Sequence, residues 1–539
     1  MPLVSAFQRY LHWPAILVVA LAALRAPAAE TPTKPQVLDT MKRATTFMVE
    51  KVSTQGGYVW QYLPDFSRRW GEMEAKPSMI WMQAPGTPEM GQLFLDAYHA
   101  TGDEYYYRAA EQVAGAVMAG QLPCGGWNYI VDFAGEKSLR EWYDTIGKNG
   151  WRLEEFLHYY GNATFDDSVS SLAAQLLLRI YVEKHDPKFK PALDRAIQFV
   201  LDSQYPVGAW PQRWPPMGEF SHHGLPDYTG FLTFNDDVII ENIEFLLQCY
   251  EVLGEQRVLD PIRRGMNSYL VTQQPAPQAG WALQFTSDLK PASARTYEPK
   301  AVVTHTTASN INNLIRFYRL TGDVKFLARI PEAISWLESV HLPPEVLKFG
   351  NGRGEYPTFL EVGTNQPLYV HRTGSNVVNG HYFVDKDPKN TIGHYSSFRT
   401  IDVAGLRQRY AEAKALSPAE AMKDSPLRPG AKPGGLPRIV TQPGGFFFGG
   451  GGGNPADRVA QIVGSLNQTG YWPTPLRSTS HPYKGDGPKE VAPGDFSRTQ
   501  VGDDSDTSPY RDDQPATGIS TAAYMRNMAT LLEFLDKAK

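Results

Sequence analysis

A tyrosine-led segment recurs along this chain at nearly regular intervals. The segments that open on Tyr98, Tyr181, Tyr250 and Tyr318 are spaced by 83, 69 and 68 residues. Each ends one amphipathic stretch and runs through a short polar turn into a second stretch, in which apolar residues stand three and four apart. Three of these units lead into a glycine–tryptophan turn, at Gly126-Trp127, Gly208-Ala209-Trp210 and Gly280-Trp281. The spacing predicts two helices plus loops in each repeated unit.

Paired helices of this kind cannot bury their apolar stripes alone, so neighbouring hairpins must share a core. The pattern therefore predicts a mainly α fold, a helical toroid of repeated α-hairpins, over residues 30–414. An open solenoid satisfies the same periodicity. The toroid is favoured because the longest polar and aromatic loops follow the same helix of each unit. They should gather on one face and form a cleft there.

The two ends of the chain differ from the repeats. Arg9 and His12 precede an apolar run over 14–24 and the sequence Ala26-Pro27-Ala28-Ala29, which predicts a cleaved secretory signal over residues 1–29. An uncleaved membrane anchor is the alternative. Residues 415–500 are rich in proline and glycine and predict an irregular excursion. Residues 501–539 should end in a helix from Thr521 to Lys539 that packs on the toroid.

The net charge and the cysteine content limit the binding partners and the disulfide bonds that we expect. The net charge of −5 argues against a nucleic-acid partner, whose binding needs a basic excess. We expect a secreted or periplasmic monomer with no membrane association after signal cleavage. Cys124 and Cys249 are the two cysteines, and the sequence leaves open whether they pair. An anionic substrate would have to be held by local positive charge.

Two acidic turns stand before helices in successive units. Residues 164–168 read TFDDS and residues 233–237 read TFNDD. Aspartates at a helix start are commonly N-caps, and that interpretation stays open. Equivalent positions of neighbouring repeats face the same side, so Asp166, Asp167, Asp236 and Asp237 could instead form one cluster of oxygen ligands, which calcium prefers.

Two further loops combine cations with aromatic rings. Residues 208–215 place Trp210 beside Arg213, a pairing that suits a sugar face and a carboxylate, although a proline-stiffened hinge is an alternative. Residues 290–298 contain Lys290, Arg295 and Tyr297, and a surface salt-bridge loop would look much the same. A segment over 358–367, ambiguous between a strand and a binding loop, follows later and leads to Arg372.

In this order, the segments resemble the pectic acid lyases of polysaccharide lyase family 10. The motifs of that family read GGW, T-x-D-N-x-A-T, GGWPQ-x-Y-P, ITFND, KPA-x-AR-x-YE and FYE-x-GTN-x-P. They correspond here to residues 125–127, 164–170, 208–215, 232–236, 290–298 and 359–367. The resemblance covers about 93–372. It implies a helical toroid that cleaves polygalacturonate by β-elimination.

The resemblance also implies roles for individual residues. The calcium-binding acids of the family correspond to Asp166 and Asp236, the catalytic arginine to Arg295, and a substrate-binding arginine to Arg372. We add Asp167 and Asp237 as metal ligands and Lys290 as a nearby cation. The candidate substrate-binding set is completed by Trp127, Trp210, Arg213 and Tyr297.

Some positions depart from the family pattern. Asp167 and Asp237 stand where the family has asparagine, which adds two negative charges. Asn128-Tyr129 follows Trp127 where the family has Pro-Lys, which removes a cation near the substrate. Two other functions therefore remain open: a glycoside hydrolase of uronic-acid oligosaccharides, which needs two carboxyls across the scissile bond, and a non-catalytic polysaccharide-binding surface protein.

Overall fold

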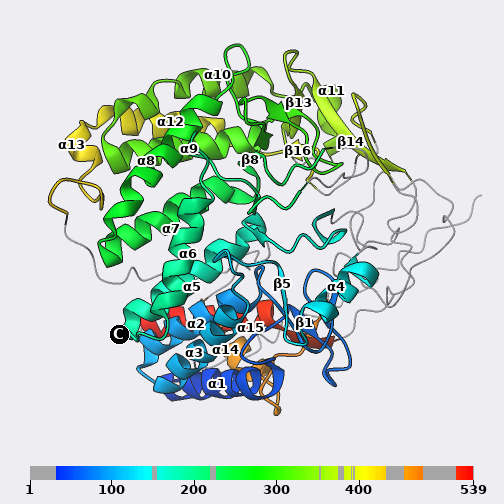
Figure 1. Cartoon of the computed structure of the whole chain (residues 1–539), viewed down its shortest axis with the longest axis vertical. Coiled ribbons are helices and arrows are strands. Elements are labelled where there is room, and N and C mark those ends of the chain that lie inside the picture. Colours follow the sequence, from blue (N-terminus) through cyan, green and yellow to red (C-terminus); the bar gives the residue numbers. More distant parts are fainter. Residues whose placement is uncertain are drawn as a thin grey trace, which may run out of the picture.

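The computed structural model in Figure 1 describes residues 32–147, 154–218, 226–350, 354–373, 381–389, 391, 395–431, 455–476 and 517–537. The expected signal segment 1–29 lies outside these ranges. The fold is built from antiparallel helix pairs. These are α2 (Thr87–Thr101) with α3 (Glu104–Ala119), α5 (Val169–Lys184) with α6 (Lys190–Asp202), α7 (Val238–Leu253) with α8 (Leu259–Thr272), and α9 (Thr304–Thr321) with α10 (Ile330–Ser339).

The tyrosine-led segments of the sequence form the bends of these hairpins. The first helix of each pair ends in a residue with left-handed backbone, at Gly102, His185, Gly254 and Gly322. In each case the N–H of this residue donates to the carbonyl oxygen of the tyrosine that opens the segment. A left-handed residue stops a helix and turns the chain, so the recurring polar turn marks the hairpin bend.

The glycine–tryptophan turns lock the second helix of a unit to the next segment. The indole N–H of Trp127 donates to the carbonyl of Val117 at 2.7 Å, and that of Trp210 donates to the carbonyl of Val200 at 2.8 Å. Trp472 repeats the arrangement with Ile462 at 2.9 Å. Trp472 follows α14 (Pro455–Ser465), so the repeat recurs within the region expected to be irregular.

The C-terminal elements extend the helical array beyond the N-terminal ones. Helix α15 (Thr521–Lys537) packs against α2, and also against α1 (Lys34–Phe47) and α14. Its preceding strand β18 (Thr517–Ser520) pairs with β1 (Gln61–Tyr62) and with β17 (Thr474–Pro475). The first and last described helices thus belong to one unit. The described parts of 415–500 contain α13 (Pro418–Ala421), α14 and β17, and the glycine run over 446–454 lies outside the description.

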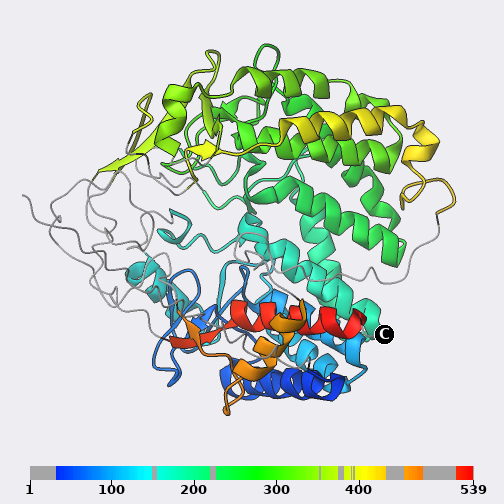
Figure 2. The same ribbon diagram turned by 180° about the vertical axis from the view of Figure 1, so that it is seen from behind.

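Short antiparallel strands connect consecutive units on one side of the helices. Strand β6 (Ala163–Thr164) pairs with β7 (Arg213–Trp214), β8 (Leu232–Thr233) with β9 (Gln284–Phe285), and β11 (Ala301–Val303) with β13 (Phe359–Glu361). Strands β14 (Pro367–Thr373) and β15 (His381–Asp385) extend the last of these. Figures 1 and 2 both show the loops and strands gathered beside the helices, as the repeat pattern predicts.

The mainly α architecture of repeated hairpins is confirmed. The hairpins lie along an arc, with α15 and α2 near one end of the long axis and α10 and α12 (Val403–Ala415) near the other in Figures 1 and 2. Among the described helices, contacts run from α15 through α2, α5 and α7, then from α8 to α9 and from α9 to α12. Closure of this arc into a complete ring is not seen among them.

One large core runs through the array and holds the tryptophans of the repeats, and two small apolar clusters lie outside it. Trp81, Trp127, Trp142, Trp210 and Trp281 are fully buried. Cys124 and Cys249 are both free thiols, so the alternative of a disulfide between them does not apply. In the described part of the chain, no helix combines the length and the apolar character that crossing a membrane requires.

Replacing Gly208 with alanine is expected to destabilise the protein by about 3 kcal/mol or more. Its φ is +100°, and a Cβ atom would lie 2.0 Å from the backbone oxygen of Arg264 in α8. Gly102 is a matched control, because its φ is +71° but its Cβ would enter open space. Gly102→Ala should cost only about 1 kcal/mol. Urea denaturation of both variants measures the difference, and equal losses would show that Gly208 does not fix the contact between units.

Candidate active site

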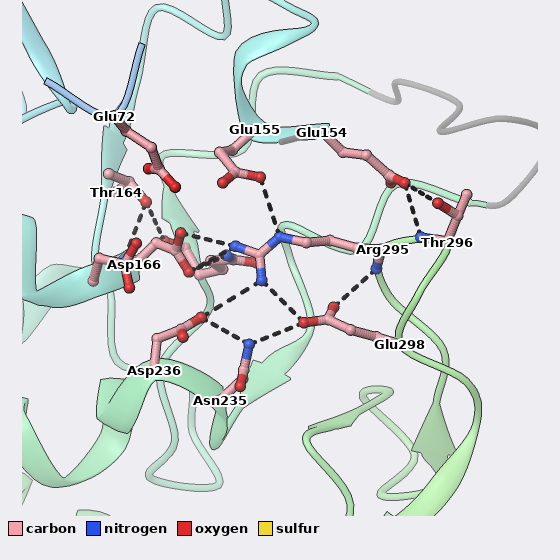
Figure 3. Close-up of polar contacts among 12 residues, drawn as sticks. Glu72, Glu154, Glu155, Thr164, Asp166, Asn235, Asp236, Arg295, Thr296 and Glu298 are labelled. Atoms are coloured by element: carbon pink, nitrogen blue, oxygen red, sulfur yellow. Dashed lines mark hydrogen bonds and ion pairs between the residues drawn. The ribbon is translucent and has the colours of Figure 1, made fainter. Parts of the chain in front are cut away.

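Arg295 lies at the centre of a buried cluster of carboxylates (Figure 3). Its Nη2 contacts both oxygens of Asp166, at 2.9 and 2.8 Å, and its Nη1 donates to Glu298 Oε1 at 3.0 Å. Nε lies 3.3 Å from Glu155 Oε2, and Nη1 lies 3.6 Å from Asp236 Oδ2. The Arg295 side chain is 3 % exposed. One guanidinium therefore faces four carboxylates from separate parts of the chain.

Asp166 is the most fully bonded acid of the cluster. Besides Arg295, Tyr129 donates its hydroxyl to Oδ2 and Gln212 donates its amide to Oδ1. The backbone N–H of Asp166 donates to the hydroxyl of Thr164 at 3.1 Å. Tyr129 stands where the related family has lysine, so the departure replaces a cation by a hydrogen-bond donor to Asp166. These donors hold the carboxylate toward Arg295.

The two acidic turns have the same backbone conformation. Asp167 and Ser168 have φ values of 46° and 62°, and Asp236 and Asp237 have φ values of 51° and 55°. Two successive left-handed residues other than glycine are strained, and such strain is concentrated at functional sites. The match makes Asp167 structurally equivalent to Asp236. The equivalent of Asp166 is therefore Asn235, which donates to Asp236 Oδ2 at 2.7 Å and to Glu298 Oε1 at 3.0 Å.

Glu154 and Glu155 come from a short 3₁₀ turn (Glu154–Phe156) on the opposite side of Arg295. Both are buried. Glu154 accepts the backbone N–H of Thr296 at 2.9 Å and also the Thr296 hydroxyl. Glu155 faces Arg295 Nε. The pair therefore fixes both the side chain of Arg295 and the residue that follows it.

The ionisable groups of the cluster differ in the direction of their pKa shifts. Burial would raise the pKa of Asp166, but the charge of Arg295 and the hydrogen bonds described above lower it well below its usual value. Burial would likewise lower the pKa of the Arg295 guanidinium, yet Asp166, Tyr297 and Glu298 raise it well above its usual value. Asp166 is therefore an anion and Arg295 a cation over the whole physiological range.

The remaining acids carry more negative charge than Arg295 can compensate. Burial, together with the charge of Asp166, raises the pKa of Asp167 to about 7 and raises that of Asp236 well above its usual value. Burial raises the pKa values of Glu154 and Glu155 to about 7. Burial and neighbouring acids also raise that of Glu72, which shares the amide of Gln83 with Asp167. Asp167, Glu154 and Glu155 would therefore bind protons near neutral pH, and a nearby cation would favour the ionised form of all five acids.

The two acidic turns and the 290–298 loop thus lie together, but two of the residues predicted for the site, Asp237 and Lys290, do not contact Arg295 in the described structure. Asp166, Asp167, Asp236 and Arg295 lie together. Asp237 is exposed, and its side chain makes no contact with Arg295 within the described residues. Lys290 is also exposed, and its nearest acid is Asp288 at 2.6 Å. Both remain predictions as a metal ligand and a substrate-binding cation, respectively.

The predicted aromatic platforms are enclosed in this conformation. Trp127 and Trp210 are fully buried and bonded to backbone carbonyls, so neither ring offers a face to a sugar. Tyr297 is 2 % exposed and packs edge-on against Tyr395. The Arg213 guanidinium is buried over the ring of Tyr160, 4.5 Å from its centroid. Their substrate contacts find no support in this arrangement.

Arg372 lies in strand β14, where its backbone is paired with Tyr382. Its side chain lies outside the described residues, so its substrate-binding role stays a prediction.

Several residues of the cluster were not singled out from the sequence. Glu298 and Gln212 belong to the motif segments 290–298 and 208–215. They could have been predicted by assuming that polar residues of different motifs contact one another. Glu72, Glu154 and Glu155 lie in segments without a repeat or motif signal. Only the fold brings these three beside Arg295.

Glu241 of α7 ties the two acidic turns together. It accepts hydrogen bonds from the hydroxyls of Ser168, which directly follows Asp167, and of Ser171 in α5. Burial raises the pKa of Glu241 to about 8, so it is mostly protonated at neutral pH. The contact joins the helix that begins after Asp237 to the turn that carries Asp166.

Glu241→Ala is expected to lower the catalytic rate about 10-fold to 100-fold, because the turn that carries Asp166 loses its support. It should also destabilise the fold by about 1–3 kcal/mol, since the buried hydroxyl of Ser171 and the half-buried hydroxyl of Ser168 lose their acceptor. Glu241→Gln, which keeps the shape and a neutral acceptor, should stay close to the wild type. Steady-state rates and thermal unfolding test this. If the alanine and glutamine variants behave alike, Glu241 does not position the turn.

The donor chemistry of the cluster suits a hard cation, because its acidic side chains present carboxylate oxygens. In the described parts of the chain, however, no three acidic, histidine or cysteine side chains converge as metal ligands. Arg295 lies between Asp166, Asp236 and Glu298. Asp167 and Glu72 accept the amide of Gln83, and Asp236 lies farthest from the guanidinium among the four acids that it faces. Asp167, Asp236 and Glu72 are the ones that would hold a calcium ion.

Residues 153–386 match the family model described as pectic acid lyase, which confirms over this segment the resemblance drawn from the motifs. No curated protein sequence matches significantly.

Similar solved structures include a family 10 polysaccharide lyase from Cellvibrio cellulosa, with 16% identity, a TM-score of 0.35 and coverage of 52% of this chain and 84% of that chain. A variant of a family 10 polysaccharide lyase from the same organism, in complex with trigalacturonic acid, has 14% identity, a TM-score of 0.40 and coverage of 60% and 98%. Cellobiose 2-epimerase from Spirochaeta thermophila has 12% identity, a TM-score of 0.37 and coverage of 62% and 76%. Likenesses this distant carry no argument about mechanism.

Proposed function

We propose that this protein is an exported polysaccharide lyase that cleaves pectate by calcium-assisted β-elimination. One observation carries the proposal: Arg295, from the loop that resembles the family motif, meets Asp166 and Asp236 from two separate motif turns. The family match over 153–386 includes all three residues. Export rests on the signal-like segment 1–29.

The reaction removes the C5 proton of a uronate and expels the oxygen at C4 of the same ring. That proton is weakly acidic because the adjacent carboxylate is already negative. Positive charge that neutralises the carboxylate and stabilises the developing enolate-like charge lowers the barrier. A site for this reaction therefore needs fixed cations, and Arg295 is the cation that the fold fixes most firmly.

Arg295 acts in this proposal as a cation rather than as the proton acceptor. Its raised pKa disfavours the neutral guanidine that a base would require. Glu155 and Asp167 have pKa values of about 7, which suits a group that accepts a proton near neutral pH. Asp167 is the more exposed of the two, but a bound calcium ion would engage its carboxylate, so Glu155 is the acceptor when the ion is present. Solvent hydroxide is the other candidate for the acceptor.

Calcium belongs to the proposal because the acids outnumber the cations. Asp167, Asp236 and Glu72 would hold the ion through carboxylate oxygens. When bound, it would supply positive charge for the uronate carboxylate. Lys290 and Arg372 would bind other acidic groups of the polymer. Support for an acidic polysaccharide comes from the match of residues 153–386 to the pectic acid lyase family model.

A glycoside hydrolase remains the second candidate, because Asp166 and Asp167 are adjacent acids of opposite character. The pKa of Asp166 is lowered and that of Asp167 is raised to about 7. Hydrolases use one ionised and one protonated carboxyl in this way. The two reactions differ in their products, since only elimination creates an unsaturated uronate.

The proposal is tested by offering pectate, methylated pectin, alginate and glucuronan with calcium and with a chelator. We expect unsaturated products from pectate, less from methylated pectin, and none with the chelator. Unsaturated products from alginate or glucuronan alone would move the substrate to another polyuronide. Binding without any cleavage of the four polymers would favour the non-catalytic surface protein.

A further inference from the structure

A second charged site lies outside the segment that matches the lyase family. A cavity of about 270 Å³ opens beside the hairpin of strands β2 (Arg69–Trp70) and β3 (Glu74–Ala75). Its lining includes Arg68, Arg69 and Lys76 but a single acid, Glu74. Three cations to one carboxylate make this cavity positive, although the whole chain is negative. It therefore suits an anion.

Arg69 is the first of two lining cations whose positive charge is available to a ligand. Arg68 is paired with Glu74, with Nε–Oε1 and Nη2–Oε2 distances of 3.0 Å. Arg69 Nη1 bonds only neutral oxygens, the Thr54 hydroxyl at 3.0 Å and the Pro77 carbonyl at 3.2 Å. Within the described chain, Arg69 has no acidic partner, and its buried Nε has no acceptor.

Lys76 is the second available cation. Its ammonium donates to the carbonyl and hydroxyl oxygens of Ser138 and lies 3.2 Å from Glu141. The Glu141 side chain is 69% exposed, so water screens this pair. A ligand carboxylate can compete for Lys76 at little cost.

The same hairpin connects the cavity to the acid cluster. Glu72, in its turn, accepts the amide of Gln83, which also donates to Asp167. Arg69 and Glu72 are three residues apart, a span of at most about 10 Å along the chain. Figure 3 places Glu72 beside Glu155 and Asp166. A polymer bound at the acid cluster could therefore extend a neighbouring unit toward the cavity.

We propose that the cavity beside Arg69 and Lys76 is a subsite for the carboxylate of a uronate unit remote from the bond that is cleaved. This choice of ligand rests on the proposed function, whereas the positive cavity does not. A free inorganic anion such as sulfate shares the same chemistry. The subsite predicts that long acidic oligosaccharides bind more tightly than short ones through Arg69.

The test is binding of hexagalacturonate and trigalacturonate to the full chain by calorimetry, in the presence of a chelator so that the proposed lyase does not cleave them. Arg69→Gln and Lys76→Gln should each weaken hexagalacturonate binding about tenfold, the loss expected for one charge-assisted contact. Trigalacturonate binding should change less than twofold. Lys325→Gln, which removes an exposed cation after α9, is the matched control and should change neither.

Unchanged hexagalacturonate affinity in both folded variants, verified by circular dichroism, would overturn the subsite. If instead Arg69→Gln abolishes binding of sulfate alone and leaves hexagalacturonate unaffected, the cavity binds free anions and the polymer subsite is wrong. A wild type that binds hexagalacturonate through Arg69 but cleaves no polyuronide would refute the proposed function and leave the subsite intact.

Discussion

Arg295→Ala should lower the rate of polymer cleavage by about 10³-fold or more, because the fixed cation of the site is lost. The same change should destabilise the protein by about 3–5 kcal/mol at pH 7, since it leaves Asp166 and its neighbouring acids buried without a counter-charge. Initial rates and urea denaturation measure the two effects separately. Both should be visible in one variant, because the guanidinium serves the fold as well as the reaction.

Two controls separate these effects. Arg295→Lys keeps one charge but not the fork that contacts Asp166, Glu155 and Glu298, so it should recover part of the stability and little of the rate. Arg316→Ala removes an arginine from an exposed pair with Glu244, and it should cost at most about 1 kcal/mol. An Arg295→Ala variant that cleaves at the wild-type rate would remove Arg295 from the mechanism.

The metal-free protein should become less stable as the pH rises from 5 to 8. Asp167, Glu154 and Glu155 have pKa values of about 7 in the folded protein, against usual values of 3.8 and 4.5. Between those limits the folded protein binds more protons than the unfolded chain, so its stability falls as the pH rises. We expect a loss of about 2 kcal/mol or more. Urea denaturation at pH 5, 6.5 and 8 measures it.

The lowered pKa of Asp166 acts in the opposite direction. Its contribution is present above the usual aspartate pKa and is lost only when the pH falls further, toward the folded value. The two trends should give a stability maximum near the usual carboxyl pKa values, at about pH 4. Asp167→Asn should flatten the fall between pH 5 and 8. A wild-type stability that is constant or rises over this range would show that the acids are already compensated.

Calcium should reverse the loss at pH 8. An ion that binds only the folded state stabilises it by about 2.7 kcal/mol at a concentration of 100 times its Kd. Thermal unfolding at pH 8 with millimolar calcium or magnesium gives the comparison. No stabilisation by calcium would remove the metal from the proposal while leaving the role of Arg295 open.

The sequence predicted the repeated hairpins because each unit carries its own local signals. The turns at Gly102, Gly254 and Gly322, and the tryptophans at 127, 210 and 281, are visible as spacing. The unit around Trp472 has the same signals, but its surroundings are rich in proline and glycine. Its two helices are also far apart in the sequence, because α15 begins more than 50 residues after the end of α14. The shape of the whole array depends on packing angles that spacing does not encode.

The site was predicted only where motifs mark it. Asp166, Asp236 and Arg295 lie together because equivalent loops of neighbouring units face one side. Glu154 and Glu155 could not be placed, since they approach Arg295 through the fold and follow no repeat. The exposure of the aromatic side chains could not be predicted from the sequence either. The polar loop around Trp210 suggests an exposed ring that could stack on a sugar, whereas the indole packs into the core.

Two product counts from one digestion of polygalacturonate with calcium test β-elimination most directly. New C4–C5 double bonds are counted by absorbance, and new chain ends are counted by a reducing-sugar assay. We predict one double bond for each new reducing end. New reducing ends without double bonds would contradict β-elimination and identify a hydrolase.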